Sequence, residues 1–235
     1  MRYERPANGS DAPIVLTLTY HYIDQDAADL NRKAFTSVVI PARGCLPLAR
    51  GGDALPSLFG LTGRSFGWIE VRGDVAEVAI SSGLNAQIDP NDPTKGVRSA
   101  QVPAVDVNSE FAFDITSDAH HAMGLERSDQ KRTNLILVNI NAKPSCQVRL
   151  LLLDAEGNDL GRKEVVVDVE QYLQINDIFG PTGFNLPPGV YRDMVIEATV
   201  VCGDGRVLGF VTINDNISRN PEIIVLRPAG PTPLF

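Results

Sequence analysis

Apolar and polar residues alternate along most of this chain, with the two-residue period of β-strands rather than the longer period of helices. From Ile14 to Tyr20, every second residue is a large aliphatic or aromatic one. From Val148 to Leu153 the apolar run is continuous, which is typical of a strand buried on both faces. Turn residues separate these segments at the spacing of a β-sandwich or barrel. The pattern therefore predicts an all-β fold.

The expected strands form two groups, with a connector between them. In the first group they are residues 14–20, 34–40, 68–71, 76–80 and 98–102. In the second group they are residues 135–138, 148–153, 163–169, 172–177, 194–201, 207–213 and 223–226. One further strand is expected at residues 111–115, within a connector that should pack on a module, and residues 118–121 should break it.

Four short phrases of the first group recur in the same order in the second. They are Val38–Ile40 with Val165–Val167, Ser57–Gly60 with Asp177–Gly180, Gly73-Asp74 with Gly203-Asp204, and Gln101–Ala104 with Leu226–Ala229. Two unrelated β-domains would also share Gly-Asp turns, but the common order favours an internal duplication. We therefore predict two tandem antiparallel β-sandwich modules, Ig-like or jelly-roll-like. Residues 1–104 form the first, residues 105–130 the connector, and residues 131–235 the second with a short tail.

The two modules differ at their start. The second opens with the strand-like segment Arg132–Asn139, whereas residues 1–12 are polar and look like a poorly ordered lead-in. The first module is thus expected to lack its opening strand and to expose an edge along Ile14–Tyr20. Residues 1–10, the strand at residues 111–115 or another chain would have to fill that gap.

Several phrases of the sequence resemble a known repeat. They are Gln101-Val102-Pro103-Ala104, Met123-Gly124-Leu125, Arg132-Thr133-Asn134-Leu135 with Val138-Asn139, Gln174–Phe179 and Asn214–Ser218. Together they resemble a tandem repeat of large secreted bacterial proteins of uncharacterised function, over about residues 13–229. The resemblance implies an extracellular or cell-surface β-sandwich with a structural, adhesive or accessory role. It supplies no catalytic residue.

The net charge and the hydropathy of the sequence argue against some classes of binding partner. The 235 residues carry a net charge of -8. This acidity argues against nucleic acid and against anionic membrane surfaces, both of which need a concentrated basic face. No apolar run approaches the ~20 residues of a membrane helix, and the first residues do not look like a signal peptide. Because the resemblance implies secretion, we expect the chain to be a fragment of a secreted or surface protein.

Two segments contain residues that can bind metal ions. Asn214, Asp215, Asn216 and Ser218 crowd one turn, and calcium prefers such oxygen ligands. The same residue types also build turns by bonding to their own backbone. His120 and His121, with Asp118, are a second candidate, although adjacent strand residues point to opposite faces. Apart from calcium, no cofactor is expected.

The cysteines and asparagines have structural interpretations. Cys146 begins one expected strand and Cys202 ends another, so a disulfide between them is plausible, with Cys45 left over. The alternative is separate, half-buried thiols. Asn134 and Asn139 flank a strand, and we expect their side chains to cap loops by bonding to the backbone.

No motif for nucleophilic, phosphate-binding or metal-dependent catalysis occurs in the sequence, and we predict that the protein is not an enzyme. The leading interpretation is a structural or adhesion module that associates with a protein partner or with itself through an exposed sheet edge. The first alternative is a carbohydrate-binding module, with Trp68, Phe66, Tyr20 and Tyr22 as an aromatic platform for a glycan. The second alternative is a hydrolase with an unrecognised site.

Overall fold

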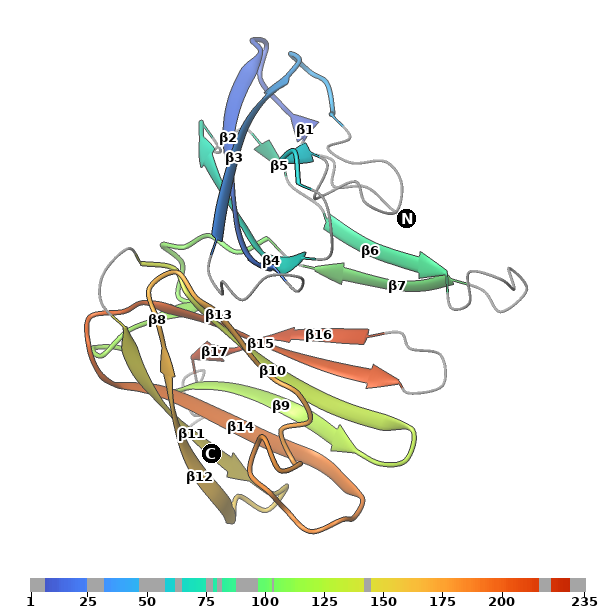
Figure 1. The fold of residues 1–235 in the computed structure, drawn as a ribbon, viewed down its shortest axis with the longest axis vertical. Coiled ribbons are helices and arrows are strands. Elements are labelled where there is room, and N and C mark those ends of the chain that lie inside the picture. The colour runs from blue at the N-terminus through green and yellow to red at the C-terminus, as the bar shows by residue number, and fades with distance from the viewer. Residues whose placement is uncertain are drawn as a thin grey trace, which may run out of the picture. The chain divides into compact units, whose positions relative to one another are not determined.

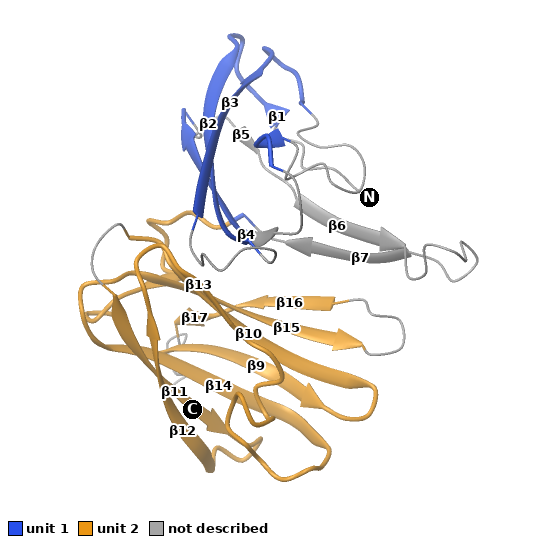
Figure 2. Cartoon of the chain, in the orientation of Figure 1, with its two compact units in different colours: residues 1–104 blue, residues 105–235 orange. Residues whose placement is uncertain are grey.

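In the computed structural model, most of the described residues lie in β-strands (Figure 1). The described residues are 7–24, 32–46, 58–61, 65–74, 78–79, 82–87, 97–102, 104–141, 145–215 and 221–228. The chain divides into two compact units, Met1–Ala104 and Val105–Phe235, hereafter unit 1 and unit 2 (Figure 2). The prediction of an all-β fold is confirmed.

Unit 2 contains two antiparallel sheets. One has the strand order β13-β10-β15-β16, with β8 also paired to β15, and the other has the order β12-β11-β14-β9-β17. The strands are β8 (Ala112–Phe113), β9 (His120–Arg127), β10 (Lys131–Asn139), β11 (Cys146–Leu153), β12 (Asp159–Val167), β13 (Tyr172–Ile175), β14 (Tyr191–Cys202), β15 (Val207–Asp215), β16 (Pro221–Val225) and β17 (Arg227–Pro228).

One hydrophobic core lies between these two sheets. Leu135 and Leu137 of β10 belong to it, as do Leu150 and Leu152 of β11 in the other sheet, and all four are fully buried. Along each strand these residues alternate with side chains that point away from the core, as expected when one face of a sheet is buried. This arrangement is that of a β-sandwich.

The segment predicted as a connector is part of unit 2 and contains two strands, not one. The expected strand at residues 111–115 is reduced to β8, which pairs with β15. Residues 118–121 were expected to break the strand pattern, but β9 begins at His120. The imidazole of His120 explains this start, because it is buried against Phe113 and its nitrogens lie 3.0 and 2.7 Å from the carbonyl oxygens of Asp118 and Glu110.

Unit 1 contains a three-stranded antiparallel sheet of order β3-β2-β4 and two strand pairs, β1 with β5 and β6 with β7. The strands are β1 (Ala7–Asn8), β2 (Ile14–Asp24), β3 (Arg32–Ile40), β4 (Ser65–Gly73), β5 (Val78–Ala79), β6 (Ser82–Gln87) and β7 (Val97–Val102). A second hydrophobic core packs on one face of the sheet and includes Leu16, Leu18, Tyr20, Ile40 and Phe59.

Two expectations about the start of unit 1 are wrong. The segment Ile14–Tyr20 does not form an open edge, because β2 is the central strand, with β3 on one side and β4 on the other. The expected poorly ordered lead-in does not extend over residues 7–12 either. Ala7 and Asn8 form β1, and the Asn8 side chain is buried. Within the described residues, β3 is an end strand of its sheet.

Candidate functional site

The same three-strand arrangement occurs in both units. In unit 1, β2 lies between its hairpin partner β3 and the later strand β4, and in unit 2, β11 lies between β12 and β14 in the same way. The first residue pair of each hairpin is equivalent, namely Ile14 with Ile40 and Cys146 with Val167. Ile40 and Val167 are both fully buried. Positions of β3 and β12 can therefore be matched by counting back from these two residues.

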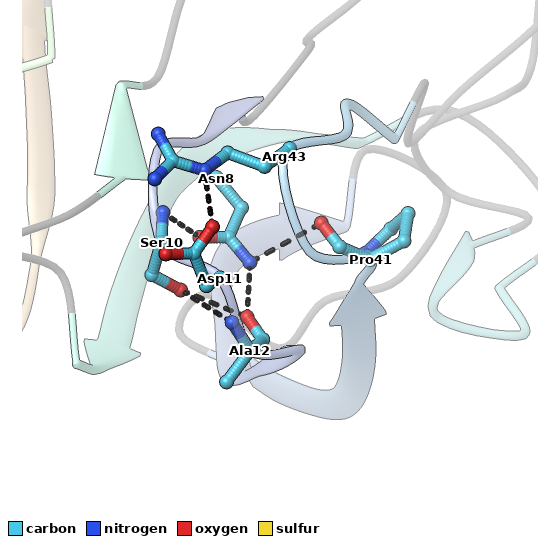
Figure 3. A network of polar contacts seen from close by, with 6 residues as sticks. All are labelled: Asn8, Ser10, Asp11, Ala12, Pro41 and Arg43. Atoms are coloured by element: carbon cyan, nitrogen blue, oxygen red, sulfur yellow. Dashed lines mark hydrogen bonds and ion pairs between the residues drawn. The ribbon is translucent and has the colours of Figure 1, made fainter.

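A buried asparagine anchors the end of the hairpin in unit 1 (Figure 3). Asn8 Nδ2 donates to the carbonyl oxygens of Ala12 at 2.7 Å, Pro41 at 3.2 Å and Ile40 at 3.3 Å. Its Oδ1 accepts the backbone N–H of Ser10 at 2.8 Å. One side chain thus ties the first strand to the end of β3.

Two of these hydrogen bonds recur in unit 2, around Asn139. Its Nδ2 donates to the carbonyl oxygen of Val167 at 3.4 Å, and its Oδ1 accepts the N–H of Asn141 at 3.2 Å. Each asparagine also pairs with a valine of the strand that follows the Gly-Asp turn, Asn8 with Val78 and Asn139 with Val207. The prediction that asparagines cap loops is confirmed for Asn139.

It is confirmed for Asn134 as well, because its Oδ1 accepts the N–H of Asp177 at 3.0 Å. The role of Asn8 could not be recognised in the sequence. Asn8-Gly9 is typical of an exposed turn. The one sequence signal for a role like that of Asn139 is that a second turn, Asp11-Ala12, follows three residues later.

The second face of the β3-β2-β4 sheet, which points away from the core of unit 1, is here called the outer face. It carries Val15, Thr17, Thr19 and His21 from β2, Lys33, Phe35, Ser37 and Val39 from β3, and Trp68, Glu70 and Arg72 from β4. Three of its apolar side chains are largely exposed, with exposed fractions of 59% for Val15, 67% for Phe35 and 55% for Val39. They lie at one end and along one edge of the sheet.

Trp68 packs on this outer face rather than on an open ligand platform. Its ring stacks on the imidazole of His21 with centroids 3.9 Å apart and planes at 2°. Glu70 lies beside them, with its Oε2 3.7 Å from His21 Nε2, and its Oε1 accepts a hydrogen bond from Arg72 Nε at 2.7 Å.

The predicted aromatic platform is not formed. Tyr20 and Tyr22 stack on one another at 5.1 Å, but both are buried on the core side of β2. Their neighbour His21 is paired with Trp68, so Trp68 lies on the other face. Successive strand residues point to opposite faces, which separates the two tyrosines from Trp68. The side chain of Phe66 is outside the described residues.

The corresponding face in unit 2 is charged. Arg149 donates two hydrogen bonds to Glu164 Oε1, from Nε at 3.1 Å and from Nη2 at 3.0 Å. Gln147 donates to the other oxygen of Glu164. Further along the sheet, His121 Nε2 lies 3.1 Å from Glu197 Oε2. Where unit 1 presents Thr17 and Ser37, unit 2 thus presents a bidentate ion pair.

The two histidines do not converge on a metal ion. His120 points inward and is buried, whereas His121 points outward to Glu197. Within the described residues, no group of three or more His, Cys, Asp or Glu side chains is placed to hold a metal ion.

Of the predicted calcium turn, Asn214 and Asp215 end β15, and Asn216 and Ser218 lie outside the described residues. Asn214 Nδ2 donates to Thr212 Oγ1 at 3.2 Å and to Thr212 O at 3.4 Å. Calcium binding at this turn stays a prediction.

The predicted disulfide is not formed, since Cys45, Cys146 and Cys202 are free thiols. Strands β11 and β14 are neighbours, but Cys202 pairs with Gln147 and not with Cys146. Cys146 therefore points into the core while Cys202 is exposed. Burial raises the pKa of the Cys146 thiol, which lowers its reactivity.

Comparisons with known proteins leave the family open. No protein family matches the sequence, and no curated protein is similar to it. Among solved structures, the chain is similar to the crystal structure of Thermotoga maritima 1070, with 10% sequence identity and a TM-score of 0.36. The similarity covers 49% of this chain and 97% of that chain. A likeness this weak establishes neither fold nor function. The part of the chain that the structure describes contains no helix long and apolar enough to cross a membrane.

Proposed function

We propose that this protein is a non-catalytic interaction module of the structural or adhesion type, built from two copies of one β-sandwich unit. In this proposal it is part of a secreted or cell-surface bacterial protein, as the sequence resemblance implies. The outer face of unit 1 is the surface through which it contacts other proteins.

Three shared features support the duplication. The strand orders β3-β2-β4 and β12-β11-β14 agree, and Asn8 and Asn139 both donate to the carbonyl oxygen of the last residue of the neighbouring hairpin, Ile40 and Val167. The third feature is a buried phenylalanine in each repeated Phe-Gly phrase that packs on a tyrosine, which comes from β2 in unit 1 and from β14 in unit 2. Phe59 packs on Tyr20 with ring centroids 5.4 Å apart, and Phe179 packs on Tyr191 at 5.3 Å.

The observation that carries the functional proposal is the exposure of Val15, Phe35 and Val39 on one face of one sheet. Apolar side chains that gather on a surface mark interaction sites more often than scattered ones do. The matching face of unit 2 also exposes Val166, but it carries the Arg149–Glu164 ion pair, and Arg162 stands where unit 1 has Phe35. The exposed aromatic side chain at this position of the edge strand is therefore particular to unit 1.

An adhesion assay tests this function. Beads coated with the protein are tested for attachment to surfaces coated with the protein itself and with bacterial cell envelopes. Attachment by the wild type that is lost in Phe35→Ser but kept in Arg162→Ser, the matched position of β12, supports the proposal. Wild-type beads that attach to neither surface would overturn it.

The carbohydrate-binding alternative has less support, because the two tyrosines of its platform are in the core and one face of Trp68 is covered by His21. A glycan array probed with the wild-type protein tests it. Binding of a sugar that Trp68→Ala abolishes would favour this alternative over the adhesion module.

A further inference from the structure

Strand β3 has the properties of an edge that can accept another strand. It is nine residues long, and it ends its sheet within the described part of the chain. Its pairing with β2 runs without a register shift from Ile14–Ile40 to Tyr22–Arg32. Every second backbone N–H and C=O of such a strand points away from its sheet, which makes a long regular edge a template for strand pairing.

The equivalent edge strand of unit 2, β12, is protected against this. Its pairing with β11 is interrupted by a register shift between Leu152 and Leu153. Lys163 faces the core side of β12, and its Nζ donates to the carbonyl oxygens of Thr182 and Gly183 at 2.9 and 3.1 Å. Bulges and inward-pointing charges on edge strands are known devices against edge-to-edge association.

A covering segment adds to this protection. Phe184 packs against the core of unit 2 and lies so close to Gly161 of β12 that an added Cβ would be 3.3 Å from its ring. The segment between the Phe-Gly phrase and the next strand is residues 181–190 in unit 2 but only residues 61–64 in unit 1.

Two of these devices, the register shift and the covering segment, have no counterpart among the described residues around β3. The only core-side charge on β3 is at its first residue, Arg32, which pairs with Tyr22 of β2 and lies 3.3 Å from Asp24. Counting back from Ile40 and Val167, Thr36 stands where unit 2 has Lys163, and Phe35 stands where unit 2 has Arg162. Thr36 carries no charge, and Phe35 is two-thirds exposed, at 67%.

We propose that β3 pairs antiparallel with β3 of a second copy of this chain, which joins two β3-β2-β4 sheets into one continuous sheet. This inference rests on the proposed function and names the partner of its surface. Phe35 and Val39 of the two copies then lie on the same face of the joined sheet, where their exposed area is partly buried.

The charges of β3 favour the antiparallel direction over the parallel one. Arg32 and Lys33 stand at one end of the strand and Val38–Ile40 at the other. Arg32 is paired with Asp24 at 3.3 Å, but a parallel pair would set Lys33 of both copies side by side, which is destabilising. An antiparallel pair centred on Thr36 sets Lys33 of each copy opposite Val39 of the other, on the order of 20 Å from the other copy's Lys33.

Sedimentation velocity over a concentration series tests the pairing, with a matched pair of variants. Val39→Lys is on β3, and Val166→Lys is at the equivalent position of β12; the wild-type side chains are 55% and 56% exposed. The wild type should be in reversible monomer–dimer equilibrium. Val39→Lys should raise the dissociation constant by about 10-fold or more, because it sets two lysines opposite each other. Val166→Lys should leave it unchanged, and circular dichroism should show that both variants are folded.

A charge-reversal variant tests the direction. Adding Lys33→Glu to Val39→Lys sets unlike charges opposite one another in the antiparallel pair and should restore dimerisation. A wild type that stays monomeric, or dissociation by Val166→Lys as strong as by Val39→Lys, would overturn the pairing, and failure of the rescue would overturn the antiparallel register. If the protein is monomeric but bead adhesion to cell envelopes still depends on Phe35, the pairing fails and the proposed function stands.

Discussion

The edge strands β3 and β12 occupy the same place in the same three-strand arrangement, yet their edges differ. β12 has a register shift, the inward-pointing Lys163 and a covering segment that contains Phe184. β3 has an uninterrupted register and the exposed Phe35. In our proposal, a few residues at this edge therefore decide whether the same strand arrangement stays closed or associates with a second copy.

The interior of the two units shows the opposite behaviour. Asn8 and Asn139 both donate to the carbonyl oxygen of the last residue of the neighbouring hairpin, and Phe59 and Phe179 are each buried in the core of their own unit. The buried asparagine and the core phenylalanine, which both units have, hold each fold together. The residues that distinguish the two units lie on their surfaces.

The largest expected effect is the loss of a core aromatic. Phe179→Ala should reduce the free energy of unfolding of unit 2 by about 3–5 kcal/mol, and Phe59→Ala should reduce that of unit 1 by a value near the lower end of that range. The chain has one tryptophan, Trp68 in unit 1, so its fluorescence in a urea titration reports on unit 1. Phe59→Ala should shift this transition and Phe179→Ala should not. Equal shifts by both would contradict separate cores.

The second effect is the loss of a buried amide. Asn8→Ala and Asn139→Ala should each destabilise their own unit by about 1–3 kcal/mol, because carbonyl oxygens lose their donor in a buried place. Trp68 fluorescence and far-UV circular dichroism in urea separate the two units. If only Asn139→Ala destabilises, the equivalence of the two networks is wrong.

A third pair of substitutions exchanges the residue types at one matched core-side position, Thr36 of β3 and Lys163 of β12. Thr36→Lys places an inward charge on β3 and should weaken self-association by about 10-fold. Lys163→Thr removes that charge from β12 and should strengthen self-association by a smaller factor, because the register shift at Leu152 remains. Light scattering after size-exclusion chromatography measures both. Unchanged association of Thr36→Lys would mean that edge charge does not control it.

The smallest effect concerns the turn that closes the β11–β12 hairpin. Asp154 accepts hydrogen bonds from Asn158 Nδ2 and from the backbone N–H groups of Asn158 and Glu156, and the bonds from Asn158 hold the pKa of Asp154 below its usual value. A carboxyl whose folded pKa is lowered stabilises the fold above its unfolded pKa, and this stabilisation is lost as the pH falls through the folded pKa.

Asp154→Asn should therefore flatten the acid dependence of unit 2 below about pH 4, with little change in unit 1. Urea midpoints measured at neutral and acidic pH by circular dichroism and Trp68 fluorescence check this. An acid dependence equal to that of the wild type would show that the turn carboxylate does not contribute.

The positions of the strands could be predicted from the local alternation of apolar and polar residues. Which strands pair with one another in a sheet could not. Ile14–Tyr20 has the pattern of a half-buried strand, but nothing in that pattern distinguishes a central strand from an edge strand. The same limit explains the failure of the aromatic platform. Tyr20 and Tyr22 share a face because of their spacing, but the pairing of Trp68 with His21 is set by a register between segments far apart in sequence.

Asn8 shows a second limit. Asn-Gly is typical of turns, and a buried role appears only once the carbonyl oxygens of Ile40 and Pro41 are known to face it. The Cys146–Cys202 disulfide was wrong for a related reason. The strand ends are adjacent as expected, but the two side chains point to opposite faces of the sheet.

The most direct test of the central claim is hydrogen exchange of the wild-type protein measured at low and at high protein concentration. The account predicts that amides of β3, Arg32–Ile40, become more protected as concentration rises, while those of β12, Asp159–Val167, keep the same exchange rates. Protection that grows in β12 instead, or in neither strand, would contradict the claim that β3 is the associating edge of this protein.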